Sequence, residues 1–269
     1  MQVSKLLYGL LGIPLIIFAY IAFTNNGEKA LWMLPFLVGM AIVYVLRPQI
    51  DWYFIKKFPP ELPEEFVQSL KRAFPFYEDL TPDQRERFNN RVTWIKMSKD
   101  FSPNPDHSIP YDVSFGMASC VAALTFHFDD YRLKDYEKVV VYKTSFPSPA
   151  YPRDIHACEV NHEDKVVLIA TDKFMMGQNK PQEYFNTALY VWSMVVEHVR
   201  KSPELPEHML EKVAKVLKFR PEAIKAYIGT PDVNDFALAS TAYFMQPQSM
   251  KKEYPELFQK MDGYYRNPG

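Results

Sequence analysis

Two long uncharged stretches near the start of the chain limit most strongly what it can fold into. Residues 6–23 (LLYGLLGIPLIIFAYIAF) and 30–46 (ALWMLPFLVGMAIVYVL) hold 18 and 17 residues without a charged side chain. A bilayer span needs about 17–25 residues at a helical rise of about 1.5 Å each. The polar segment between the stretches, residues 24–29 (TNNGEK), predicts a tight turn. We therefore predict a transmembrane helical hairpin over residues 1–50.

Two other interpretations explain these stretches less well. A secretory signal peptide has an apolar segment of about 7–15 residues followed by a small-residue cleavage site, and the first stretch is longer and lacks that site. A hairpin buried in a soluble core is disfavoured because two such stretches follow one another directly.

The charges beside the stretches predict the orientation of the hairpin. Lys5 precedes the first stretch, and Arg47, Lys56 and Lys57 follow the second, whereas the turn carries Lys29 next to an acidic residue. Positive charge favours the cytoplasmic side. We expect a multi-pass protein of the inner or plasma membrane, with both termini and the soluble domain in the cytoplasm.

The composition excludes some classes of partner. The formal net charge is -1, which gives no basic excess for nucleic acid. The chain has two cysteines, too few for a disulfide framework, which fits a reducing compartment.

The remaining sequence predicts a connector over residues 51–61 and one soluble domain over residues 62–269. Strands are expected from β-branched runs, with a turn at residues 161–164 joining the last two into a hairpin. The predicted strands are residues 138–142, 155–160 and 165–169. Helices are expected from apolar periodicity and from a start signal at Thr81-Pro82. The predicted helices are residues 64–72, 81–99, 113–126, 184–200, 206–217, 232–245 and 255–265. Helices, a small sheet and more helices make an α+β domain.

Four stretches of this domain resemble one known family. They are residues 80–88 (LTPDQRERF), Ser119-Cys120 with the strand 139–142 and Phe146, residues 186–189 (NTAL), and residues 235–244 (DFALASTAYF) followed by Pro247, 254–257 and 264–268. In this order and spacing the domain resembles the Mlc titration factor A (MtfA) family of zinc peptidases. The resemblance implies a zincin-like, mostly helical fold with a small sheet.

The resemblance also implies where the family's chemistry would lie. In a His-Glu-x-x-His helix two histidines bind zinc and the glutamate is the general base. Aligned on residues 186–189, those positions hold Tyr190, Val191 and Met194, and the family's later glutamates fall on Asp235 and Thr241. A neutral phenol and a thioether are poor zinc ligands, and valine cannot accept a proton. Only Asp235 retains a ligating group.

These replacements predict a degenerate member of the family with no catalytic residue and no expected cofactor. Loss of a general base alone costs about 10²–10⁴ in rate, and here the metal ligands are replaced as well. The apolar stripe that includes Tyr190 and Met194 is expected to fill the volume of the former metal site. The alternative is a groove that binds peptide without cutting it.

Weaker metal candidates lie elsewhere in the chain. His156 and Cys158 share one face of a strand, with His162 in the following turn. His198 ends a sequence resembling an inverted zincin motif that lacks its first histidine. We expect ordinary surface histidines at these positions, and a hydrogen-bonded structural role for His127.

Three functions follow from this sequence. The first is a membrane-anchored pseudopeptidase that binds or regulates an unidentified cytoplasmic protein or peptide. The second is an active zinc metallopeptidase with non-standard ligands, which would require zinc. The third is a structural subunit of a membrane complex.

Overall fold

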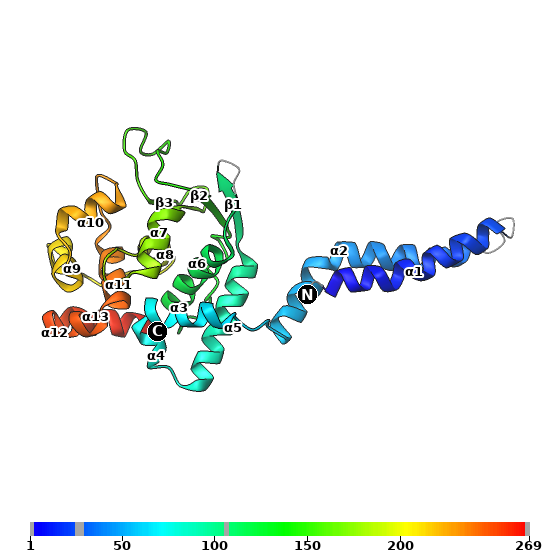
Figure 1. Ribbon diagram of the computed structural model, residues 1–269, viewed down its shortest axis with the longest axis horizontal. Helices are drawn as coiled ribbons and strands as arrows, with labels where there is room; N and C mark the ends of the chain where they lie inside the picture. The colour runs from blue at the N-terminus through cyan, green and yellow to red at the C-terminus, as the bar shows by residue number, and fades with distance from the viewer. Residues whose placement is uncertain (1–2, 25–29, 105–107, 267–269) are drawn as a thin grey trace. The chain divides into compact units, whose positions relative to one another are not determined.

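The structure, a computed structural model, describes residues 3–24, 30–104 and 108–266. The chain divides into two compact units, Met1–Pro60 and Glu61–Gly269 (Figure 1). The described part of the first unit contains only helices, and the sheet belongs to the second unit.

The first unit consists of α1 (Val3–Thr24), a short 3-10 turn η1 (Ala30–Met33) and α2 (Leu34–Lys57). Both long helices are apolar and long enough to cross a membrane, and almost nothing within them is buried. Most of the predicted turn, residues 25–29, lies outside the described residues.

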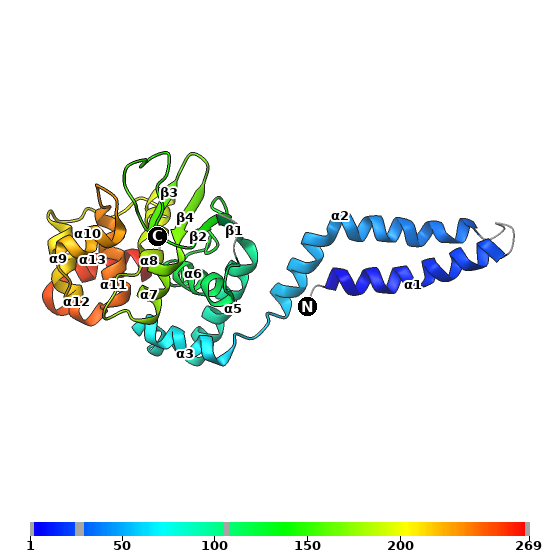
Figure 2. The ribbon, with the colours of Figure 1, turned by 45° about the horizontal axis from the view of Figure 1, so that its top comes forward.

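Contacts at both ends hold α1 beside α2 (Figure 2). The backbone N–H and the hydroxyl of Ser4 donate to the two carboxylate oxygens of Asp51 at 2.9 and 2.7 Å. Toward the other end, the ring of Phe18 stacks on Trp32 and Phe36 at centroid distances of 6.3 and 5.6 Å. α2 continues to Lys57, so the predicted connector begins as helix.

The second unit is built on a four-stranded sheet of order β1-β2-β4-β3. β1 is Asp100–Asn104, β2 is Lys138–Tyr142, β3 is Cys158–Asn161 and β4 is Val166–Ala170. β1, β2 and β4 are parallel, and β3 pairs with β4 as the predicted antiparallel hairpin. β3 therefore has a hydrogen-bonded strand on one side only.

Two details of the sheet differ from the sequence prediction. β1 was missed because its sequence (DFSPN) has no β-branched residue, and Pro103 is tolerated because β1 is an edge strand. β3 starts at Cys158 instead of residue 155. The preceding residues pair elsewhere: His156 forms a bridge with Phe146, and the Ala157 N–H donates to Ile228 O at 2.7 Å.

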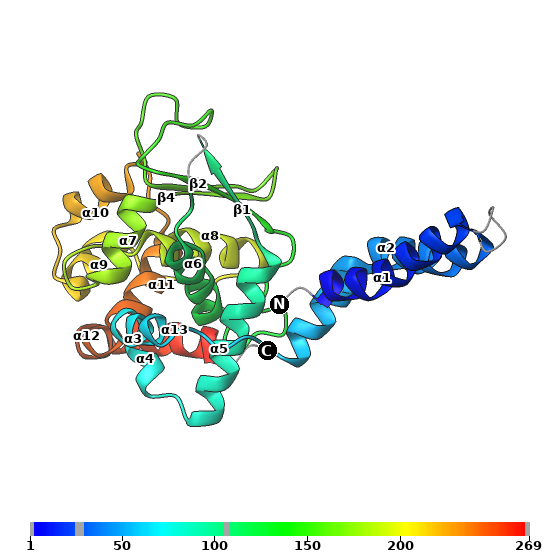
Figure 3. The same ribbon diagram turned by 45° about the vertical axis from the view of Figure 1, so that its right-hand side comes forward.

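Three helices form the core beneath the sheet (Figure 3). They are α6 (Tyr111–Leu124), α8 (Thr187–Val199) and α11 (Asp235–Met245), and α8 packs against both others. Nearly all residues of α6 and α11 are buried, as is α8 up to Val196. The apolar composition that predicted central helices is thereby explained by burial on all sides.

The outer helices include one with the predicted cap. α5 (Pro82–Ser98) begins after Thr81, whose hydroxyl accepts from the Gln84 N–H at 3.3 Å while the Thr81 N–H donates to the Gln84 side chain at 3.0 Å. This capping box satisfies two free N–H groups of the first turn. The other predicted outer helices are present as α3 (Glu64–Ala73), α9 (Met209–Leu217) and α13 (Pro255–Arg266). Residues 267 and 268, part of the last resembling stretch, lie outside the described residues.

Four short helices were not predicted. They are α4 (Pro75–Glu78), α7 (Thr171–Asn179), α10 (Pro221–Ile228) and α12 (Pro247–Glu253). Three of them start at a proline, which suits the first helical position because its missing N–H would be unsatisfied there anyway.

Candidate functional site

The start of α8 is held by a buried polar network. The Asn186 side-chain oxygen accepts from the backbone N–H groups of Ala188 and Leu189 at 3.1 and 3.0 Å, and its amide donates to Gln178 at 3.2 Å. The Cys120 thiol lies 3.9 Å from the same Asn186 oxygen. Burial raises the pKa of Cys120, so this cysteine stays a thiol and is not a nucleophile. The network fixes where α8 begins.

The three helix positions that the sequence alignment predicts to correspond to the zinc motif lie one turn further on. Tyr190 is buried and its hydroxyl accepts from the backbone N–H of Asn234 at 2.7 Å. Burial is the main reason that the pKa of Tyr190 is raised, so it remains a neutral phenol. Val191 is fully buried and Met194 is half-buried.

Tyr190 and Met194 face one cavity of about 270 Å³, which we call the α8 cavity. Cys158 and Glu159 of β3 line its opposite wall, and Asn234 closes it before α11. The Asn234 side chain also donates to the Glu197 carboxylate at 2.6 Å. Asn234 therefore links α11 to α8 at two points.

Asp235 and Thr241 do not complete a metal site here. Asp235 is exposed and is not among the residues that line the α8 cavity. Its pKa is raised by burial of part of the carboxyl group and by the nearby Glu211 and Glu197. Thr241 is fully buried, and its hydroxyl donates to Ala237 O at 2.7 Å.

Both ring nitrogen atoms of His156, which was predicted to lie on a strand, are close to oxygen atoms. His156 is fully buried, with Nδ1 3.1 Å from Asp154 O and Nε2 3.0 Å from the Glu159 carboxylate. The expectation that His156 is a surface histidine is therefore wrong. Burial, followed by the charge of Glu159, raises the pKa of Cys158, which disfavours the thiolate that a metal needs.

The other two histidines considered as metal ligands, His162 and His198, contact each other. The rings of His162 and His198 stack at a centroid distance of 4.1 Å and an interplanar angle of 16°. Tyr136 fixes this pair, because its hydroxyl lies 2.8 Å from His162 Nδ1. Burial lowers the pKa of His162, His198 lowers it further, and Glu197 opposes both. His162 thus belongs with His198, on the end of α8, and not with His156 and Cys158.

The donor chemistry around α8 does not fit zinc. Structural and catalytic zinc sites use at least three ligands from His, Cys, Asp and Glu. Across residues 3–24, 30–104 and 108–266 no group of three such side chains is placed to hold a metal ion. In the full sequence, no two histidines stand four residues apart.

Comparison with known proteins assigns the chain to a family. Residues 53–188 and 195–266 match the family described as glucose-regulated metallo-peptidase M90, so the domain is metallopeptidase-like. The chain belongs to this MtfA-like family, and the resemblance seen in the sequence is confirmed at that level. No curated protein matches the chain. The interval between the matched segments, residues 189–194, contains Tyr190, Val191 and Met194.

Sequence analysis did not identify three residues that form contacts in this region, namely Asn234, Glu159 and Tyr136. Asn234 was detectable, since an Asn directly before an acidic residue and an apolar run is a helix-start signal. Glu159 and Tyr136 had no such signal: Glu159 contacts His156, three residues away, only through the local bend before β3, and Tyr136 meets His162, 26 residues away, only in the folded chain.

Proposed function

We propose that this chain is a membrane-anchored, catalytically inactive member of the M90 family whose soluble domain binds a segment of another protein. The observation that carries the proposal is the chemistry of one face of α8. Where the zinc motif places two imidazoles, the α8 cavity has the Tyr190 phenol and the Met194 thioether, and the position of the general base is the buried Val191.

The replaced groups act together, which supports loss of catalysis. Without ligands no metal would lower the pKa of a water molecule, and without a base no side chain would take its proton. The Tyr190 hydroxyl already accepts a hydrogen bond from Asn234, which competes with ligation of a metal. The interval 189–194, where the family match breaks off, coincides with these positions.

The α8 cavity supports binding of an extended peptide. It lies beside β3, which is an edge strand of the sheet, and Cys158, Glu159 and Val160 of that strand form part of its wall. An edge strand offers backbone hydrogen bonds to an added strand, while a pocket selects one of the side chains. A segment lying along β3 would place a side chain against Met194.

The first unit supports attachment to a membrane. We infer a hairpin over residues 1–50, a connector over 51–61 and the binding domain over 62–269, with both termini in the cytoplasm. The exposed apolar surfaces of α1 and α2 suit lipid, and the basic residues Arg47, Lys56 and Lys57 suit the cytoplasmic side. The partners are then the membrane and a cytoplasmic protein or peptide, with neither metal cofactor nor nucleic acid.

A cleavage and binding experiment tests the proposal on the full chain in detergent. The chain would be incubated with a library of unstructured peptides, with and without added zinc, and products and bound peptides identified by mass spectrometry. We expect binding without cleavage, and loss of binding in Met194→Trp, which fills the cavity. Met176→Trp, at an exposed methionine of α7, is the matched control and should bind normally. Zinc-dependent cleavage, or equal binding by both variants, would contradict the proposal.

A further inference from the structure

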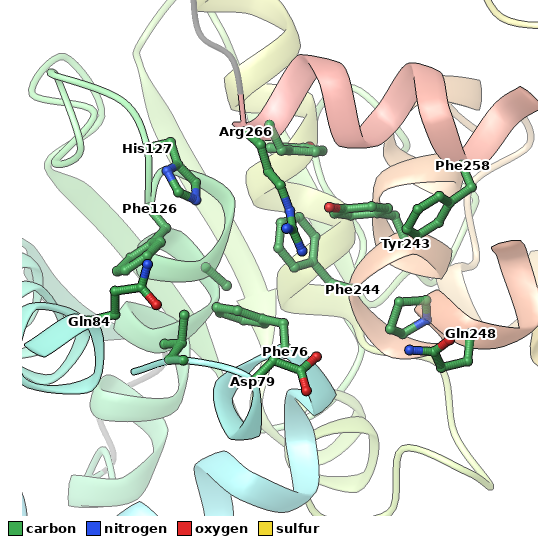
Figure 4. Close-up of a pocket in the computed structure, with 14 residues that line it drawn as sticks. Phe76, Asp79, Gln84, Phe126, His127, Tyr243, Phe244, Gln248, Phe258 and Arg266 are labelled. Atoms are coloured by element: carbon green, nitrogen blue, oxygen red, sulfur yellow. The ribbon is translucent and has the colours of Figure 1, made fainter. Parts of the chain in front are cut away.

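A second cavity, which we call the aromatic pocket, lies away from α8. It has a volume of about 190 Å³ and is bounded by α4, the start of α5, the end of α6 and the helices α11 to α13 (Figure 4). None of its lining residues lines the α8 cavity. Whatever it binds is therefore separate from the face of α8 discussed above.

Six of the fourteen residues that line the pocket are phenylalanine or tyrosine. Phe76 lies 5.8 Å from Phe244 and 6.5 Å from Phe126, and Phe244 lies 4.9 Å from Tyr265, measured between ring centroids. An apolar cavity of about 150 Å³ in another protein admits benzene. The aromatic pocket is thus large enough for a six-membered ring or a branched aliphatic group.

One side of the pocket is cationic. His127 is exposed and forms no hydrogen bond within the described ranges, so the expectation of a hydrogen-bonded structural residue is wrong. Burial of part of the ring lowers the pKa of His127, and the nearby guanidinium groups of Arg87, Arg266 and Arg91 lower it further, with Asp262 opposing. Several positive charges therefore converge at this edge, beside an imidazole with free nitrogen atoms.

Arg266 is the cation that lines the pocket itself. Its Nε atom pairs with Asp262 at 2.9 Å, which fixes the guanidinium beside the pocket that it lines. Burial works to lower the pKa of Arg266, but Tyr243, Asp262 and Asp79 outweigh it and raise the pKa. The guanidinium is charged at every physiological pH.

The opposite side carries an anion that forms no salt bridge within the described residues. Asp79 ends α4, and Figure 4 shows it across the rings of Phe76 and Phe244 from Arg266. Its backbone N–H donates to Phe76 O at 3.2 Å, but no hydrogen bond or salt bridge reaches its carboxylate from the described residues. A carboxylate at the rim of an aromatic pocket is available to an incoming ammonium group.

We propose that the aromatic pocket binds a free amino acid with an aromatic or branched apolar side chain. The side chain packs against the wall formed by Phe76, Phe126 and Phe244, the α-carboxylate lies toward Arg266 and His127, and the α-ammonium lies toward Asp79. Positive and negative groups on opposite sides of an apolar pocket match a zwitterion and select against ligands that carry only one of the two charges.

Three related ligands test this proposal on the full chain in detergent by isothermal titration calorimetry. They are phenylalanine, 3-phenylpropionate, which lacks the ammonium group, and phenethylamine, which lacks the carboxylate. We expect saturable binding of phenylalanine and about tenfold or more weaker binding of each analogue, since a hydrogen-bonded charge is lost each time. Absence of saturable phenylalanine binding, or equal affinity for all three ligands, would overturn the proposal.

One substitution locates the site without disturbing the core. Asp79→Asn should bind phenylalanine about as weakly as the wild-type chain binds 3-phenylpropionate, and should no longer distinguish these two ligands. Asp83→Asn, an exposed acid of α5 that does not line the pocket, should bind as the wild type does. If Asp79→Asn keeps the wild-type preference, the ammonium group does not lie at Asp79 and the proposal fails.

Discussion

Two neighbouring parts of α8 differ in what they retain of the M90 family. Asn186, Thr187 and Ala188 lie in a matched segment, and Asn186 forms the buried cap with Gln178. Residues 189–194 lie outside both matched segments and present a phenol, a buried valine and a thioether at the positions that the sequence alignment predicts for the zinc motif. Because the cap positions the helix and the next turn carries the chemistry, one can persist without the other.

The core side and the cavity side of this helix can therefore be considered separately. Trp192, within this stretch, and Val195, directly after it, are both fully buried, so the helix is well packed on its core side. On the cavity side, the Tyr190 hydroxyl accepts a hydrogen bond from the Asn234 N–H. A metal ion bound by Tyr190 would have to compete with this bond. The helix thus contributes to stability through its buried core side, while its cavity side presents a phenol and a thioether.

The largest effect is expected from restoring the acid at the general-base position. Val191→Glu would place a carboxylate where the side chain is fully buried, and should lower the free energy of unfolding by about 3–5 kcal/mol. Val199→Glu, at the exposed end of the same helix, should change it by less than about 0.5 kcal/mol. Chemical denaturation measures both. A small effect of Val191→Glu would mean that this position opens onto solvent or a cation.

The next effect concerns the cap. Asn186→Ala removes two bonds to backbone N–H groups and leaves Gln178 short of a buried partner, so the unfolding free energy should fall by about 2 kcal/mol. Asn161→Ala, at the end of β3, removes exposed hydrogen bonds to Asp164; it is the control and should cost clearly less. Equal losses would show that the α8 network is not a special support for the helix.

A smaller effect should follow from removing one hydroxyl in the α8 cavity. Tyr190→Phe leaves the Asn234 backbone N–H without its acceptor, which should cost about 1–2 kcal/mol. Tyr111→Phe, at an exposed tyrosine, should be nearly neutral in the same thermal or chemical unfolding series. If Tyr190→Phe is neutral as well, a water molecule replaces the acceptor that the Asn234 N–H has lost. The Tyr190 hydroxyl would then not be needed for the stability of this region.

The smallest effect is a pH dependence at the end of α8. The pKa of His162 is lowered in the folded chain, so the unfolded chain takes up the proton first as the pH falls below about 6.5. Stability should therefore decrease as the pH falls from 7 to about 5. His162→Gln should remove part of that decrease, and His198→Gln should weaken it, because His198 is one cause of the shift. An unchanged pH profile in His162→Gln would refute this assignment.

The sequence predicted the fold better than the surroundings of the site. The two apolar N-terminal helices, the central helices and the β3–β4 hairpin followed from local patterns of charge, apolarity and capping. β1 and the short proline-started helices did not, because β1 has no β-branched residue and helices of four to eight residues are too short to show a helical period. In the site, the positions of Tyr190 and Met194 on one face followed from helical periodicity. The pairing of His156 with Glu159, and of His162 with His198, depends on the path of the chain between them.

Metal content of the full chain tests the central claim most directly. The protein would be purified in detergent, dialysed against excess zinc and then buffer, and its bound metal measured by elemental analysis, with folding checked by circular dichroism. A folded chain should hold less than about 0.1 equivalent of zinc, because the α8 cavity offers a phenol and a thioether in place of imidazoles. One tightly held zinc per chain, lost in Asp235→Asn or His198→Gln but not in Asp83→Asn, would contradict an inactive peptidase domain.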